Sequence, residues 1–227
     1  MGKIGDNYKR LRDSIPLDVS IVVASKMRSH REIEEVIEAG ATIIGENYVY
    51  PEALSKYQSL GEIAKKVNWH LIGPLQKNKI NKALPIFDLI QTIDSLKISI
   101  EINKRVKRTG KSVIPVLLEI NSGSEKTKSG FLPDFEVIKN VVLEMEELEY
   151  INIRGLMTMG PMFGDPENAR MYFKVTRELF EKMKDINTNN CQMEILSMGM
   201  SNSYRVAIEE GSNMVRIGTL IFGERKK

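Results

Sequence analysis

The stretch that decides the fold is SIVVASKMRSHREIEEVIEAG, residues 20–40. It begins with the apolar run Ile21 to Ala24, which is typical of a short strand buried on both faces. Ser29 followed by Glu32 has the spacing of a capping box, and Gly40 is a typical helix stop. The stretch therefore predicts one strand followed by one helix.

The same unit recurs along the chain. Short segments rich in Ile, Val and Leu alternate with helical patterns that carry caps or glycine stops. The expected strands are residues 20–25, 42–47, 68–74, 87–94, 112–121, 150–159, 193–199 and 213–219. This alternation is typical of either a closed (β/α)8 barrel or an open doubly wound sheet.

The length of the chain favours the barrel. It has 227 residues and no Pro/Ser-rich linker that would divide it, and barrels of about 200 residues lie at the short end of their range. We therefore expect an α/β fold with one domain over residues 1–227. A single (β/α)8 TIM-type barrel would span residues 20–223, after an extra N-terminal helix over residues 1–16.

The composition argues against several classes of protein. The net charge of +3 is too small to indicate a nucleic-acid partner. No apolar run approaches the roughly 20 residues that span a bilayer, and the N-terminus has no signal core. One cysteine and two histidines argue against a disulfide and a metal site. We expect a cytoplasmic protein without a membrane partner, and a monomer.

Polar residues follow the expected strands, at the end where barrels carry their chemistry. Lys26 follows the first strand. A lysine at the end of an isolated strand is most often only solvated. A lysine held in a barrel mouth can instead form a Schiff base with an aldehyde.

The last two units have the features of a phosphate site. Barrels often bind phosphate with the loops after strands seven and eight. Here Ser201 is expected to begin a helix that Gly211 ends, while Gly218 and Thr219 follow the last strand. Taken alone, Ser201 could be only an N-cap and Gly218 only a turn. Together they predict backbone N–H groups and hydroxyls around an anion.

Arg216 interrupts an otherwise apolar strand, MVRIG. Barrel strands have no exposed edge, so an arginine that points inward needs a hydrogen-bond acceptor. The ring nitrogen of a ligand would be suitable.

An amine, a phosphate site and a buried arginine together resemble the site of the pyridoxal phosphate homeostasis protein family. Its members are single-domain barrels related to the N-terminal domain of alanine racemase. The matching segments, which run in order from about residue 20 to 223, are VVASK, GENYV, WHLIGPLQKNK, TIDS, EINSGSEKTKSGF, RGLMTM, LSMGMS and GSNMVRIGTLIFG.

The resemblance implies pyridoxal 5'-phosphate (PLP) as the cofactor. It implies that Lys26 forms the internal aldimine, that Arg216 faces the pyridine nitrogen, and that His70 helps to shape the mouth. The other implied contacts are Asn47 near the ring, then Ser201, Gly218 and Thr219 at the phosphate with Ser197 beside them. It implies no catalytic residue.

The resemblance also implies a non-catalytic carrier that buffers or delivers PLP in vitamin B6 homeostasis, with PLP-dependent apo-enzymes as possible partners. The alternative is an amino-acid racemase of the alanine racemase type. Racemisation needs proton transfer on both faces of the α-carbon. In alanine racemases a tyrosine from a second domain serves one face, and we expect no such domain here. An unrelated barrel enzyme acting on a phosphorylated sugar would also use Lys26, but it explains Arg216 less well.

The sequence departs from the family pattern in two loops. Tyr50 and Pro51 follow GENYV, where the family usually continues with Gln-Glu. Ser203 and Arg205 stand where acidic residues are common, which makes the phosphate end more positive. A further hypothesis makes Lys128, in the loop after strand five, a gate for release of the cofactor, although a solvated loop lysine is at least as good an account.

Overall fold

The computed structural model of the protein describes residues 2–110, 113–125, 129–161 and 164–224. Eight parallel strands close into a barrel in chain order, with β8 paired to β1. The strands are β1 Ser20–Ala24, β2 Ile43–Glu46, β3 Asn68–Leu71, β4 Leu89–Ile93, β5 Ile114–Ile120, β6 Ile151–Thr158, β7 Cys191–Ser197 and β8 Met214–Ile217. The closed barrel is confirmed, and the open sheet is excluded.

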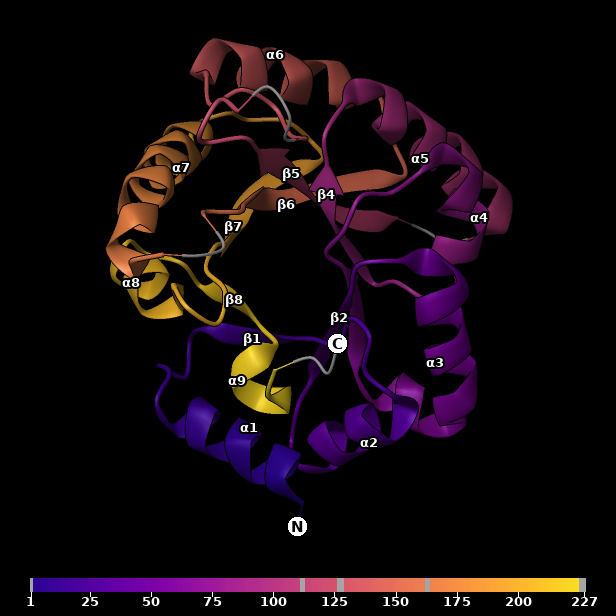
Figure 1. Ribbon diagram of the computed structural model, residues 1–227. Coiled ribbons are helices and arrows are strands. Elements are labelled where there is room, and N and C mark those ends of the chain that lie inside the picture. Colours follow the sequence, from indigo (N-terminus) through magenta and orange to yellow (C-terminus); the bar gives the residue numbers. More distant parts are fainter. Residues whose placement is uncertain (1, 111–112, 126–128, 162–163, 225–227) are drawn as a thin grey trace.

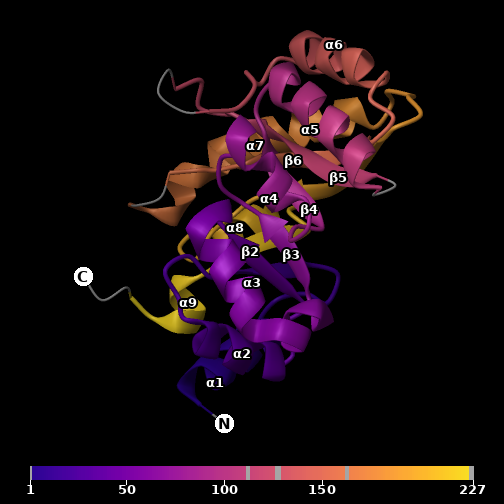
Figure 2. The same ribbon diagram turned by 90° about the vertical axis from the view of Figure 1, so that its right-hand side faces the viewer.

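The helices form a ring outside the strands (Figure 1). They are α1 Lys3–Asp13, α2 His30–Glu38, α3 Leu54–Leu60, α4 Ile80–Ala83, α5 Leu96–Thr109, α6 Phe135–Met145, α7 Arg170–Met183, α8 Tyr204–Glu209 and α9 Thr219–Phe222. Shorter helical turns are Val49–Ala53, Gly61–Lys66, Lys77–Lys79 and Pro166–Ala169. Helices α1, α2 and α9 gather at one side of the molecule (Figure 2). Within the described ranges, no helix combines the length and the apolar character that a membrane span requires.

Local signals in the sequence place most helix ends correctly. Ser29 and Glu32 form the expected capping box of α2. The Asp134 side chain accepts a hydrogen bond from the Val137 N–H at the start of α6. Gly110 ends α5 in the left-handed conformation. These ends are set by hydrogen bonds within a few residues, so the sequence alone identifies them.

The helix expected to begin at Ser201 begins instead at Tyr204, with Ser203 at the N-cap position. The Ser201 hydroxyl accepts a hydrogen bond from the Gly218 N–H at 3.2 Å, so it joins two loops and caps no helix. The short helix α9 after β8 was not predicted.

The alternation of side chains along each strand divides the interior of the barrel into layers. In β8, Val215 and Ile217 pack in the shell between strands and helices. Met214 and Arg216 alternate with them and lie inside the barrel. An apolar layer fills the interior, with Val22, Leu89, Leu117, Met157 and Met214 among its members. Two residues further along three of these strands stand the buried polar residues Gln91, Glu119 and Arg216. The apolar layer thus forms the floor of a polar mouth.

Candidate cofactor site

Arg216 is buried in the polar layer and is held from β6 and β7. One terminal nitrogen donates to the Ser197 carbonyl at 2.9 Å and to the Ser197 hydroxyl at 2.6 Å. The other donates to the Thr158 carbonyl at 2.8 Å. Burial lowers the pKa of Arg216 to about 10, against the opposing effect of Glu119, so the guanidinium stays charged at neutral pH. These bonds use only part of the donor set of a guanidinium.

Ser197 connects Arg216 to a neutral histidine. The Ser197 hydroxyl donates to the Gln91 carbonyl oxygen at 2.7 Å, and the Gln91 amide lies 3.0 Å from His70 Nδ1. Burial lowers the pKa of His70 to about 4, so the imidazole is neutral and its Nδ1 accepts from the amide. His70 lies on β3, as expected, but inside this network. Ser197 is fully buried and positions the Arg216 guanidinium through its carbonyl and hydroxyl oxygens.

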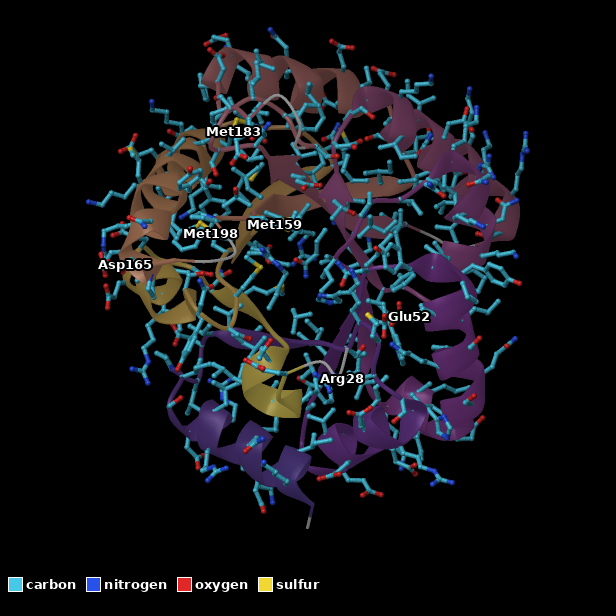
Figure 3. The ribbon with its side chains drawn as sticks, viewed as in Figure 1. Arg28, Glu52, Met159, Asp165, Met183 and Met198 are labelled. Atoms are coloured by element: carbon cyan, nitrogen blue, oxygen red, sulfur yellow. The ribbon has the colours of Figure 1, made fainter. Side chains whose placement is uncertain are left out.

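Glu119 is a buried carboxyl that the sequence analysis missed. It lines a cavity of about 180 Å³ together with Asn47, Thr92, Asn121 and Met159. Met159 lies on the β6–β7 side of the ring (Figure 3). Burial, followed by the nearby Asp94 carboxylate, raises the pKa of Glu119 to about 7, against the opposing charge of Arg216. Of the predicted cofactor residues, all of which are described, Asn47 is the one that lines this cavity.

The raised pKa of Glu119 predicts a pH effect on stability. Between pH 4.5 and about 7 the folded protein keeps a proton on Glu119 that the unfolded chain has released, so stability falls as the pH rises through this window. Glu119→Gln removes this dependence. Relative to the wild type, the variant should gain about 3 kcal/mol between pH 4.5 and 8, at about 1.4 kcal/mol per pKa unit.

Urea unfolding at a series of pH values measures this difference. The lowered pKa of His70 acts in the opposite direction, between pH 4 and 6.5, but it is present in both proteins and cancels. A difference between variant and wild type that does not change with pH would contradict the assignment.

Lys26 lies half-buried just beyond β1 and reaches toward the loop after β2. Its Nζ is 3.3 Å from the Tyr48 hydroxyl and 4.9 Å from the centre of the Tyr48 ring. Tyr48 directly follows Asn47, which lines the cavity. The amine therefore stands at the mouth, on the side where Asn47 lies.

The loops after β7 and β8 meet beside the end of β1. Gly218 donates its N–H to the Ser201 hydroxyl. A Cβ on Gly218 would stand 3.0 Å from the Ala24 carbonyl oxygen, so the absence of a side chain allows this close approach to β1. Thr219, exposed at the start of α9, is next in the chain. Gly218 thus approaches the chain at Ala24, two residues before Lys26.

The loops that depart from the family pattern also have defined contacts. Tyr50 is exposed in the helical turn Val49–Ala53, and the Lys82 amine lies 3.8 Å from its ring centre. Ser203 is buried and accepts from the Met200 N–H at 3.3 Å, whereas Arg205 is exposed and donates to the Tyr204 hydroxyl. Residues 126–128, and with them the proposed gate Lys128, lie outside the described residues.

These groups fit a phosphorylated pyridine aldehyde. The site offers a primary amine on Lys26, a buried cation with unused donors on Arg216, and a hydroxyl donor for a phosphate on Ser201, which the Gly218 N–H holds in place. The fit rests on the chemistry of the donors and on the close approach of Gly218 to β1.

Comparisons with known proteins identify the family of the chain. The family model described as the N-terminal domain of alanine racemase matches residues 1–226. The pyridoxal phosphate homeostasis protein of Aquifex aeolicus (strain VF5) is 40% identical over 203 residues, which cover 89% of this chain and 86% of the relative. The protein of the same name from Escherichia coli (strain K12) is 33% identical, over 99% of this chain and 98% of its own.

Solved structures show the same fold. PipY of Synechococcus elongatus PCC7942, solved with PLP bound, has a TM-score of 0.86 and 28% identity, over 97% of this chain and 100% of its own. An alanine racemase of Clostridium difficile 630 has a TM-score of 0.79 at 18% identity, over 99% of this chain and 56% of its own, which shows the fold alone. The chain belongs to the pyridoxal phosphate homeostasis protein family, which is built on the barrel of the alanine racemase N-terminal domain.

Proposed function

We propose that this protein binds PLP in the mouth of its barrel and acts in vitamin B6 homeostasis as a non-catalytic carrier. The observation that carries the proposal is Arg216, a charged and buried side chain whose hydrogen bonds to Ser197 and Thr158 go to neutral acceptors and leave donors for a ligand. The name shared by the relatives from Aquifex aeolicus and Escherichia coli supports the role in homeostasis.

Each proposed contact uses a group already positioned by the fold. PLP, when bound, supplies an aldehyde that reacts with a primary amine. Lys26 would hold that aldehyde, and Arg216 would donate to the ring nitrogen. The remaining proposed contacts are Asn47 beside the ring, and Ser201, Gly218 and Thr219 at the phosphate. Ser197 would act through Arg216, because its hydroxyl is bonded to Arg216 and Gln91.

The same arginine argues against turnover. A ring nitrogen that accepts from a charged Arg216 stays unprotonated, which makes the ring a weaker electron sink. The experiment that tests the proposal titrates the protein with PLP by absorbance and follows α-proton exchange of alanine in heavy water. We expect saturable binding at one site without exchange. Fast exchange with inversion that disappears in Lys26→Ala would overturn the carrier in favour of the racemase.

We propose PLP-dependent apo-enzymes as the recipients of the cofactor, and a monomer as the form that delivers it. The mouth carries the whole proposed site on one chain, which supports a monomer.

Thr219→Val should weaken PLP about ten- to hundredfold, since a charge-assisted hydrogen bond contributes roughly 1.5–3 kcal/mol. Unphosphorylated pyridoxal has no phosphate for this hydroxyl to contact, so it should lose much less affinity. Valine keeps the shape of threonine and removes only the hydroxyl. Equilibrium titrations with both ligands measure the two losses. Equal losses would remove the case for a phosphate contact at Thr219.

A further inference from the structure

A buried cluster of charges lies directly behind Lys26. The Lys56 amine is 2.6 Å from a carboxylate oxygen of Glu46 and 2.7 Å from one of Glu52. It also donates to the Ser25 carbonyl at 2.7 Å. The Glu46 side chain is fully buried and that of Lys56 is 9% exposed. Burying such charges costs free energy even when they are paired, so the cluster needs a reason beyond stability.

The cluster holds both peptide groups that flank Lys26. The Ser25 carbonyl, which accepts from Lys56, belongs to the peptide group before Lys26. The Met27 N–H, which donates to the Glu52 carboxylate, belongs to the peptide group after it. Lys56 and Glu52 are themselves paired. The backbone of Lys26 is therefore clamped from both sides by one ion pair.

The backbone at this point needs such a clamp. Met27 has a φ of 61°, in the left-handed region that residues with a side chain rarely adopt. Its own side chain is 66% exposed and does little to fix it. A strained residue of this kind persists only where surrounding contacts determine its conformation. The bond from its N–H to Glu52 is such a contact.

Glu46 anchors the clamp to the barrel. It follows Gly45 on β2, and its carboxylate accepts from the Ser25 hydroxyl at 2.5 Å as well as from Lys56. Glu52 comes from the helical turn Val49–Ala53, the loop in which Tyr50 and Pro51 depart from the family pattern. In Figure 3 Glu52 lies on the α3 side of the ring. The departing loop is thus tied to the residue proposed to bind the cofactor.

We propose that the Glu52–Lys56 pair, anchored on Glu46, is a positioning device that sets the direction of the Lys26 side chain toward the cofactor aldehyde. This inference rests on the proposed function. In the bond that Lys26 would form, Nζ adds to the aldehyde carbon, a C=N bond replaces C=O, and the oxygen leaves as water. The rate of that step depends on how well the amine is aligned. The clamp acts on alignment and makes no contact with the ligand.

The test compares two ligands in Glu52→Gln. PLP can bond to Lys26, whereas pyridoxine 5'-phosphate has no aldehyde and reports non-covalent binding alone. We expect the rate of appearance of the PLP absorbance band to fall about ten- to hundredfold, while the affinity for pyridoxine 5'-phosphate stays within about twofold. Glu62→Gln, which breaks the exposed pair with Lys65, is the matched control and should leave both values unchanged.

A second variant separates the clamp from a general role in stability. Met27→Gly accepts the left-handed conformation without strain, so Glu52→Gln combined with Met27→Gly should recover part of the lost rate. If Glu52→Gln does not fold, Glu52→Asp replaces it in both comparisons. A wild-type rate in Glu52→Gln, equal losses for both ligands, or no recovery in the double variant would overturn the inference. If the wild type itself forms no bond at Lys26, the proposed function has failed.

Discussion

Lys26→Ala should abolish covalent retention of PLP. The Lys26 amine stands at the mouth beside Tyr48, and alanine removes it completely. The other proposed contacts remain, so PLP should still bind reversibly, through Arg216 and the loops after β7 and β8. After borohydride treatment and denaturation, the variant should carry no pyridoxyl group, whereas the wild type should carry about one per chain, as expected when one amine is oriented for attack.

The matched control is Lys82→Ala. Lys82 belongs to α4 and lies against the exposed Tyr50 ring, so it is a neighbouring lysine whose loss leaves Lys26 in place. It should retain PLP like the wild type. Retention of an unchanged absorbance band in Lys26→Ala, with the label on another lysine, would show that the assignment of Lys26 is wrong.

Gly155→Ala should destabilise the barrel by more than about 4 kcal/mol, the range of exceptional single substitutions. Gly155 lies in β6 where the pairing shifts register toward both neighbouring strands. A Cβ there would lie 1.8 Å from the Ile195 carbonyl oxygen of β7, and the φ of +148° is unfavourable for a side chain. Since the clash is with backbone, the strands themselves would have to separate.

Gly40→Ala is the control that isolates the clash. Gly40 also has a positive φ, of +105°, but a Cβ there meets nothing within 4 Å. It should therefore cost only the backbone strain of roughly 1–2 kcal/mol. Denaturant unfolding of both variants gives the comparison. Similar losses for Gly155→Ala and Gly40→Ala would contradict the close approach of β6 and β7.

Most of the fold could be predicted from the sequence because the strands and most helix ends depend on a few neighbouring residues. The run at Ile21 to Ala24 and the capping box at Ser29 are signals of this kind, and both are confirmed. The helix start at Ser201 was wrong because its hydroxyl is used by Gly218, seventeen positions away. A bond between two loops leaves no local pattern.

The site could be predicted only in part. Arg216 was found because a charge interrupts an apolar strand, and Glu119 and Gln91 carry the same signal in LLEI and LIQTI. Applied to every strand, that rule would have found them too. Lys56 could not be found in this way. It stands in a helix among polar neighbours, and it is buried only because packing brings α3 against the Ser25 carbonyl.

The central claim is that one lysine of the barrel mouth holds PLP. It is tested most directly by reducing the wild-type protein with borohydride in the presence of one equivalent of PLP and mapping the labelled peptide by mass spectrometry. We predict a single pyridoxyl group on the peptide that contains Lys26. A label spread over exposed lysines such as Lys65, or a single label on any lysine other than Lys26, would contradict the claim.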